Sequence, residues 1–87
     1  MENNTVKIAA AGNAVVPAIL VLESRSYNIS TSADGYWHAE KDGCIFTAES
    51  PLELLGLTEM YVARGSNWKA IDIDIDRCMK QYTGLAG

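Results

Sequence analysis

The sequence has 87 residues, 48% of them hydrophobic, and its seven Lys and Arg against eleven Asp and Glu give a formal net charge of −4. This length fits one domain, residues 1–87, with a modest core, and the apolar share argues against a disordered chain. The basic residues are scattered rather than clustered, so we expect no nucleic-acid partner, which would need a basic patch to neutralise phosphates.

Cysteine usage and the N-terminus indicate a cellular compartment. Cys44 and Cys78 are too few for a disulfide framework or a four-cysteine zinc site. The first residues, M-E-N-N-T, are acidic and polar, unlike the basic start of a secretory signal. The apolar run from Val15 to Leu22 is far shorter than the roughly 20 residues that span a bilayer. We therefore expect a cytoplasmic protein with reduced, buried cysteines and no membrane partner.

In chain order, the first predicted element is a helix. Weak alternation over residues 5–9 permits a short extra N-terminal strand before it. Asn13 is the expected N-cap, Pro17 falls near the first turn, and the helix runs to about Ser26. Apolar residues cover several faces, so we expect this helix to be well buried.

Two Asp-Gly pairs predict a three-stranded antiparallel meander in the middle of the chain. They join runs rich in β-branched and aromatic residues, with strands expected at 27–32, 36–40 and 44–49.

The expected distribution of apolar residues between the two sheet faces decides the length of each loop. A three-residue first loop ending in Gly35 is preferred because it pairs Thr31 with Trp37 and gathers the apolar residues on one face. A two-residue second loop pairs Ala39 with Phe46. The predicted core face holds Tyr27, Ile29, Trp37, Ala39, Cys44, Phe46 and Ala48. The predicted outer face holds Tyr36, His38, Glu40, Ile45, Thr47 and Glu49.

The clearest helix signal lies between Ser50 and Gly65. Ser50 can cap the N-terminus, Pro51 suits the first helical position, and Glu53 can close a capping box. Arg64 in the last turn complements the helix dipole, and Gly65 can adopt the left-handed conformation that ends a helix.

This helix has more apolar surface than one buried stripe requires. One broad face carries Leu54, Leu55, Leu57, Thr58, Tyr61 and Val62, and a second strip carries Leu52, Gly56, Met60 and Ala63. Either the helix is central in the core, or the second strip contacts another subunit. Gly56 costs about 1 kcal/mol in a helix interior, so we expect it to permit close approach of another element.

A terminal helix is predicted from the apolar spacing of Ile75, Cys78, Met79 and Tyr82, with Asp72 as N-cap and Gly84 as the stop. The strands are expected to pack against the two helices that flank them in sequence. The fold class is therefore α+β: a three-stranded antiparallel meander flanked by an N-terminal helix and two C-terminal helices.

Three aspartates alternate at the start of the terminal helix. Asp72, Asp74 and Asp76 match the first acidic positions of a calcium-binding EF-hand loop. Arg77 then stands where that loop needs glycine, and Thr83 where it needs glutamate. Favourable interaction with the helix dipole explains the same residues without a metal; whether they do more stays open.

No catalytic constellation is visible in the sequence. His38 is the only histidine, and the predicted register places it and Cys44 on opposite sheet faces, which argues against a thiol–imidazole pair. Phosphate-binding glycine loops and zinc-hydrolase motifs do not occur. We therefore predict no enzyme, no cofactor and no metal.

Exposed aromatic and small residues provide a candidate interaction surface. Trp68 either fills the core between the last two helices or stays exposed at an interface. The candidate residues are Tyr36, His38, Glu40, Thr47, Gly56, Met60, Ala63 and Trp68. We expect a protein–protein interaction module, either a homodimer or an acidic partner of a basic protein, for example immunity-like. The alternative is a small-molecule-binding protein or minor enzyme with a pocket between sheet and helices or at a dimer cleft.

Overall fold

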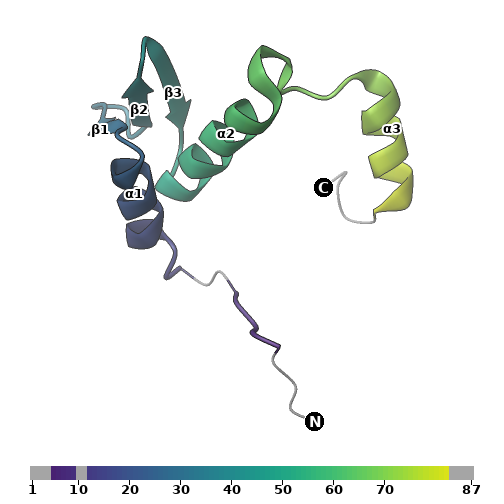
Figure 1. Ribbon diagram of the computed structural model, residues 1–87, viewed down its shortest axis with the longest axis horizontal. Coiled ribbons are helices and arrows are strands. Elements are labelled where there is room, and N and C mark those ends of the chain that lie inside the picture. The colour runs from purple at the N-terminus through teal and green to yellow at the C-terminus, as the bar shows by residue number, and fades with distance from the viewer. Residues whose placement is uncertain (1–4, 10–11, 83–87) are drawn as a thin grey trace.

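The computed structural model of the protein describes residues 5–9 and 12–82 and confirms the α+β class. Its elements, drawn in Figure 1, are α1 (Val15–Ser24), β1 (Asn28–Thr31), β2 (Trp37–Lys41), β3 (Cys44–Ala48), α2 (Pro51–Arg64), the short 3₁₀-helix η1 (Gly65–Asn67) and α3 (Asp72–Gln81). All three predicted helices and all three predicted strands are present.

Two expectations at the N-terminus are wrong. Residues 5–9 have no regular secondary structure, and Val6 and Ile8 are exposed, because the segment pairs with no sheet edge (Figure 1). The N-cap of α1 is Ala14 rather than Asn13, so the helix starts one residue later than expected and has no side-chain cap.

The end of α1 connects the helix directly to the sheet. Ser26 has a φ of 68°, and its backbone N–H donates to the Glu23 carbonyl at 3.0 Å. The Tyr27 N–H donates to the Leu22 carbonyl at 3.1 Å. This pair of hydrogen bonds is a Schellman motif, in which the residues on either side of the reversal meet in the apolar interior. Leu22 and Tyr27 are both buried there.

The sheet has the predicted meander topology and register. Its strand order is β1-β2-β3, with Thr31 opposite Trp37 and Ala39 opposite Phe46. The β2–β3 turn has positive φ at both central residues, 52° at Asp42 and 80° at Gly43, as a two-residue hairpin loop requires. This turn sets the register in which β3 pairs with β2.

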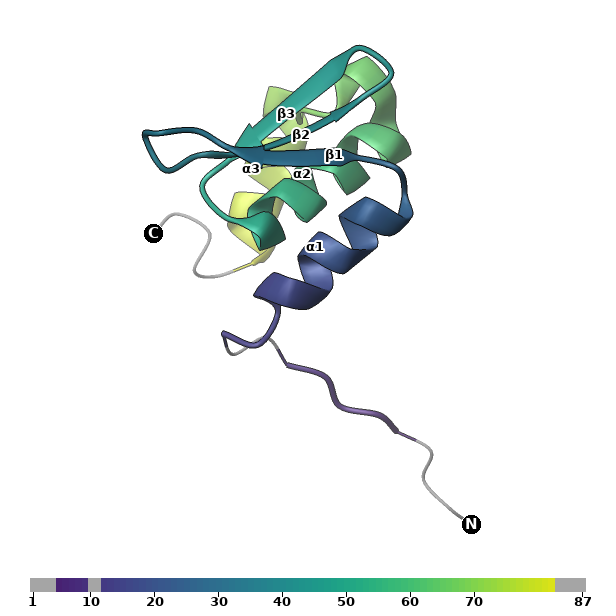
Figure 2. The same ribbon diagram turned by 90° about the vertical axis from the view of Figure 1, so that its left-hand side faces the viewer.

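The core lies between the predicted inner face of the sheet and helices α1 and α2. Leu22, Tyr27, Ala39 and Leu54 are buried together, and the residues packed against them include Ile29, Trp37, Phe46, Ala48 and Leu55. Helix α1 packs on α2 and β1, and α2 packs on β2 and β3. Figure 2 shows the sheet on one side of this layer and the two helices on the other.

Both flanking helices are less buried than their composition predicts. In α1 only Ala18 and Leu22 are buried, while Val15, Val16 and Leu20 are exposed. The sheet is narrow, with three strands, and it can cover only one side of each helix. The expectation of a well-buried first helix is therefore wrong.

Helix α2 begins and is anchored largely as predicted. The Ser50 hydroxyl accepts a hydrogen bond from the Glu53 N–H at 3.2 Å and lies 3.2 Å from the Glu53 carboxylate. Leu54 and Thr58 are buried on the sheet side, and the Thr58 hydroxyl donates to the Leu55 carbonyl at 2.8 Å. Only one face of α2 is buried, so the helix is not central in the core.

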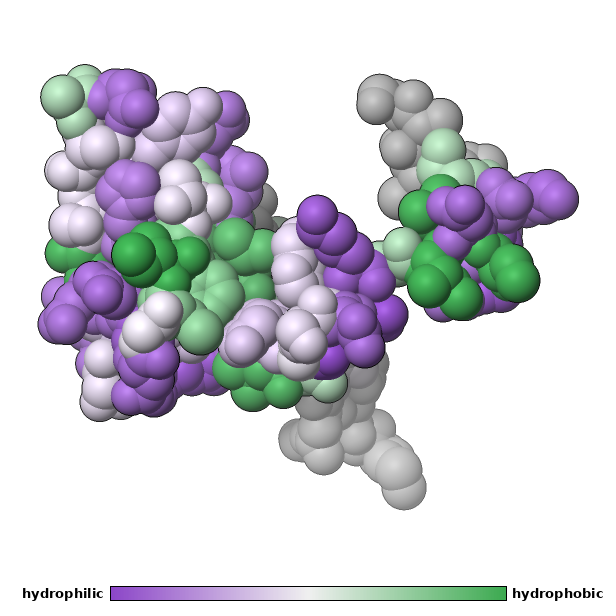
Figure 3. All heavy atoms as spheres, turned by 90° about the horizontal axis from the view of Figure 1, so that it is seen from above, coloured by the Kyte–Doolittle hydropathy of each residue, from purple (hydrophilic) through white to green (hydrophobic). Residues whose placement is uncertain are grey.

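Helix α3 stands apart from the rest of the chain. None of its ten residues is buried, and it takes part in none of the extensive packing between elements. Figure 3 shows it separated from the remainder of the molecule, with apolar side chains on its surface. Its N-cap is Ile71, which corrects the assignment of that role to Asp72. The predicted stop at Gly84 lies outside the described residues.

Candidate interaction surface

A groove of about 670 Å³ runs between the free edge of β3 and helix α2 and brings together five of the predicted surface residues. These are Tyr36, Thr47, Gly56, Met60 and Trp68. Ala48, Glu49, Glu53 and Leu57 complete its lining. We call this site the groove.

The sequence builds the groove from two rigid walls. One wall is β3, an edge strand whose outer side is left unpaired because the chain leaves the sheet at Ser50. The other wall is α2, which Leu54 and Thr58 fix against the sheet. That orientation turns the strip of Leu52, Gly56, Met60 and Ala63 outward, and all four residues are exposed.

Gly56 leaves open space in the α2 wall. A Cβ atom at this position would meet no atom of the chain within 4 Å. Among the residues that the structure describes, none makes the close approach expected at Gly56. The cost of a glycine in a helix interior has no compensating contact inside the monomer.

Trp68 follows the reversal that ends α2. Gly65, with a φ of 70°, and the η1 turn redirect the chain, and Trp68 is then half-buried along the groove. It does not fill a core between the last two helices, because α2 and α3 do not pack extensively together. Its contact with a partner at an interface stays a prediction.

The far end of the groove continues into a second hollow of about 370 Å³, lined by Cys44, Ile45, Phe46, Thr47, Leu57, Tyr61 and Trp68. There the Tyr61 ring meets Phe46 edge-on, with centroids 5.5 Å apart. The Cys44 thiol lies 3.9 Å from the Tyr61 hydroxyl, and this hydrogen bond together with charge repulsion from Cys44 raises the pKa of Tyr61. The two packed rings form part of the base of this hollow.

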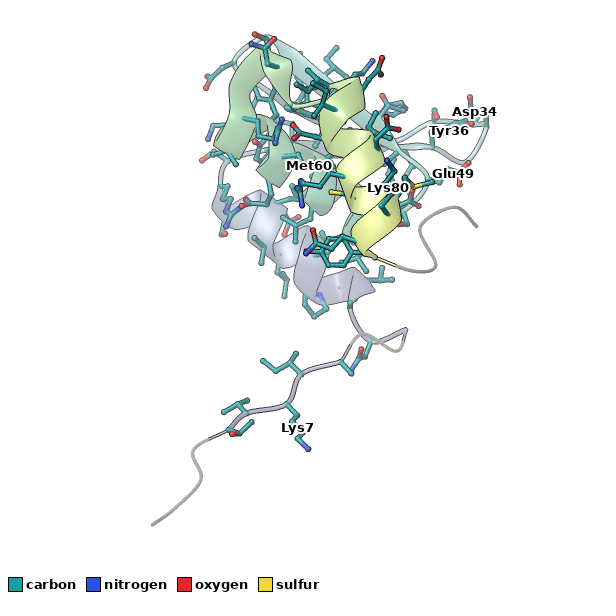
Figure 4. All side chains as sticks on the ribbon, turned by 90° about the vertical axis from the view of Figure 1, so that its right-hand side faces the viewer. Lys7, Asp34, Tyr36, Glu49, Met60 and Lys80 are labelled. Carbon is teal, nitrogen blue, oxygen red and sulfur yellow. The ribbon has the colours of Figure 1, made fainter. Side chains whose placement is uncertain are left out.

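The charged residues that line the groove are acidic and lie at one end, and basic residues follow beyond its other end. Glu49 and Glu53 line one end, and Glu49 also shares a hollow of about 260 Å³ with Asp34 and Tyr36. Figure 4, which views the molecule from the α3 side, shows Asp34, Tyr36 and Glu49 together at one end of the sheet. At the other end, α2 finishes with Arg64, and Lys69 follows Trp68 with its ammonium 5.7 Å from the indole centroid.

Three predicted surface residues are not part of the groove. His38 and Glu40 lie on the outer face of the sheet, where a His38 ring nitrogen is 2.9 Å from the Thr47 hydroxyl. Ala63 is exposed on α2 but does not line the groove. His38 and Cys44 lie on opposite faces of the sheet, as the register predicts.

Helix α3 carries an apolar stripe, four residues of which the sequence analysis identified from their spacing. Residues at positions i, i+4, i+7, i+8 and i+11 share one face of this helix. They are Ile71, Ile75, Cys78, Met79 and Tyr82, and we call them the α3 stripe. Ile71 is 64% exposed, Ile75 45% and Tyr82 52%. The spacing revealed the stripe, but spacing alone cannot show whether a chain covers its own stripe.

The described residues contain no group of three or more His, Cys, Asp or Glu side chains arranged to hold a metal ion. Asp72, Asp74 and Asp76 lie in the first part of α3, where the helix dipole favours carboxylates. Over residues 5–9 and 12–82, no helix has the length and apolar character needed to cross a membrane.

Comparisons with protein-family models, with curated proteins and with solved structures find no match to this chain.

Proposed function

We propose that this protein is a protein–protein interaction module and that the groove is its binding surface. The observation that carries the proposal is the coexistence of a preformed, largely apolar groove with an amphipathic helix whose apolar stripe stays exposed. Monomeric proteins rarely expose large contiguous apolar surfaces unless something binds there.

The lining of the groove resembles the centre of a protein interface. Met60 and the aromatic rings of Tyr36 and Trp68 belong to residue types enriched at interfaces. Glu49 and Glu53 form a charged rim at one end. This combination of an apolar centre and a polar rim is typical of specific association.

The total exposed surface supports the same proposal. The chain exposes 7002 Å². A compact monomer of this mass would expose only about 5,000 Å². The radius of gyration is 16.0 Å, against about 12 Å for a compact domain of this length. Part of this excess comes from the extended residues 5–9 and part from α3 (Figure 1).

We place this activity in a reducing cytoplasm. Cys44 and Cys78 are both free thiols, and disulfides are rare in that compartment. The net charge of −4 suits a basic protein partner, whereas self-association needs local pairs of opposite charge.

The test compares two substitutions on α2. Met60→Asp places a carboxylate in the groove, whereas Val62→Asp places one at a position that is 69% exposed and outside the groove. We would measure self-association of each purified protein by sedimentation, and capture of partners from host lysate by each tagged protein.

The proposal predicts that wild type and Val62→Asp associate alike, with themselves or with one stoichiometric partner, and that Met60→Asp does not. It is overturned if wild type neither self-associates nor retains any partner. Association that Met60→Asp leaves unchanged would equally exclude the groove as the binding surface.

A further inference from the structure

We propose that the groove of each chain binds the α3 stripe of a second copy, so that two chains form a symmetric dimer by exchanging α3 helices. This inference rests on the proposed function and specifies its partner. The partner copy completes the site, since each chain supplies one groove and one helix.

The helix and the groove match in length and character. The ten residues of α3 make a helix about 15 Å long. The groove and the second hollow that continues it are together lined by all five residues of β3, which extend about 17 Å. The α3 stripe presents four large apolar side chains and Cys78 along this length. Facing them are the open backbone at Gly56 and the side chains of Met60 and Trp68.

Gly56 is the position at which a helix can approach most closely. Small residues on one helix allow the backbone of another to come near, which increases the contact per residue. Inside the monomer nothing uses this space. A helix from a second copy gives the glycine a structural role that its own chain does not.

The charges favour an antiparallel arrangement of α3 along α2. The first half of α3 carries Asp72, Asp74 and Asp76, and the second half carries Arg77 and Lys80. Glu49 and Glu53 line one end of the groove, and beyond the other end α2 finishes with the basic Arg64, one turn after Met60. An antiparallel helix would place its Asp-rich start at the basic end and its Lys80 turn at the acidic end. This orientation also opposes the two helix dipoles.

Exchange between two chains covers both exposed surfaces at once. A standard interface buries about 800 Å² on each partner, and in this arrangement each chain contributes both a groove and a helix to that area. A two-fold axis makes the contact reciprocal and closed. Both grooves and both helices are then occupied, so neither is free to bind a third chain and form a filament.

The position of α3 in its own chain favours a partner chain. The space between α3 and the end of α2, about 440 Å³, is lined by Arg64, Ala70 and residues of α3, and none of the groove residues contacts it. Gly65 and the η1 turn hold α3 away from its own groove (Figure 3). Three residues of the α3 stripe, Ile75, Cys78 and Met79, line this space, and Ile75 and Met79 stay exposed in it.

The experiment uses two full-length variants with complementary defects. Gly56→Arg fills the groove at a position where a side chain meets nothing in its own chain. The double variant Ile75→Asp, Met79→Asp removes the apolar character of the α3 stripe at two exposed positions. Ile73→Asp is the matched control, because Ile73 is 75% exposed on the opposite face of α3. Circular dichroism verifies that each variant folds.

Sedimentation would measure association of each variant alone and of an equimolar mixture. We expect wild type and Ile73→Asp to dimerise, and each of the other two variants alone to dissociate, with the Kd raised at least about tenfold. Their mixture should form a one-to-one heterodimer, since the first variant keeps a functional helix and the second a functional groove.

Three outcomes would overturn the exchange. A monomeric wild type with a radius of gyration near 12 Å would show that α3 folds back on its own groove. A dimer that persists in both variants would place the interface elsewhere and would also refute the groove as a binding surface. A monomer that captures another protein through Met60 would refute exchange alone and leave the proposed function standing.

Discussion

Replacing Gly56 with alanine should stabilise the monomer. Gly56 lies in the interior of α2, and glycine there is destabilising by about 0.5–1 kcal/mol relative to alanine because its backbone loses more freedom on folding. The added Cβ meets no atom of the chain within 4 Å. The substitution therefore causes no steric clash, and the higher helix propensity of alanine should raise the free energy of unfolding.

The expected shift in melting temperature follows from the part of the chain that folds cooperatively. Residues 14–68 contain the packed elements, whereas α3 makes no extensive contact with them. Roughly 55 residues at about 2.1 cal/mol/K each give an unfolding entropy of about 0.12 kcal/mol/K. A gain of about 0.5–1 kcal/mol thus raises Tm by about 4–8 °C.

The assay is thermal unfolding followed by circular dichroism at a protein concentration too low for association. Gly65→Ala is the control, since Gly65 has a φ of 70°, where a side chain is strained, and this variant should lower Tm. A fall in Tm for Gly56→Ala in the dilute monomer would refute the reasoning, because it would mean that the site is crowded within a single chain.

Three further changes test the core, the α1 terminus and one turn. Leu54→Ala should cost about 2–5 kcal/mol in denaturant unfolding, since Leu54 is fully buried; Leu52→Ala, at an exposed position, should cost less than about 0.5 kcal/mol. Ser26→Gly should stabilise by up to about 1 kcal/mol, because it relieves a side chain at a φ of 68°, and an unchanged midpoint would contradict this. The hydrogen bond from the Ser32 hydroxyl lowers the pKa of Asp34, so Ser32→Ala should raise that pKa towards 3.8 in an NMR titration. A carboxyl pKa that is lower in the folded chain than in the unfolded chain stabilises the fold at pH values above the unfolded-state pKa. This stabilisation is lost as the pH falls through the folded-state pKa, so wild type should lose it on acidification and the variant should not.

Local chemistry was the part of this fold that the sequence determined most closely. The Asp-Gly turns and the alternation of apolar residues predicted both strand registers, since a slip of one residue would have turned Trp37 and Phe46 to the outside. The Ser50 cap and the Gly65 reversal were predicted for the same reason: each depends on residues only a few positions apart.

Burial was predicted less well because it depends on how much surface the neighbouring elements can cover. Some apolar side chains are of types common in cores but are exposed, because a three-stranded sheet is too narrow to cover them. They are Val16 and Leu20 of α1 and Val62 of α2. The same limit applied to the α3 stripe. Its spacing was evident, but no sequence pattern specifies whether the covering surface belongs to the same chain.

The candidate surface was predicted in part. Tyr36, Thr47, Gly56, Met60 and Trp68 converge on the groove, although they come from a turn, a strand, a helix and a connector. His38 and Glu40 were expected to join them because they share the outer face with Thr47. Thr47 belongs to the edge strand and reaches the groove, whereas His38 and Glu40 belong to the central strand and do not.

The isolation of α3 has a consequence for how its helical order arises. A ten-residue helix without extensive tertiary packing is marginal in water, because nucleation is costly and few backbone hydrogen bonds offset it. Amide hydrogens of α3 should therefore exchange rapidly in the dilute chain, while those of α2 exchange only through global opening. Docking would then be coupled to helix formation, and the ordering cost would reduce the affinity while leaving the specificity of the apolar stripe intact. Such a chain would associate and separate readily as its concentration changes.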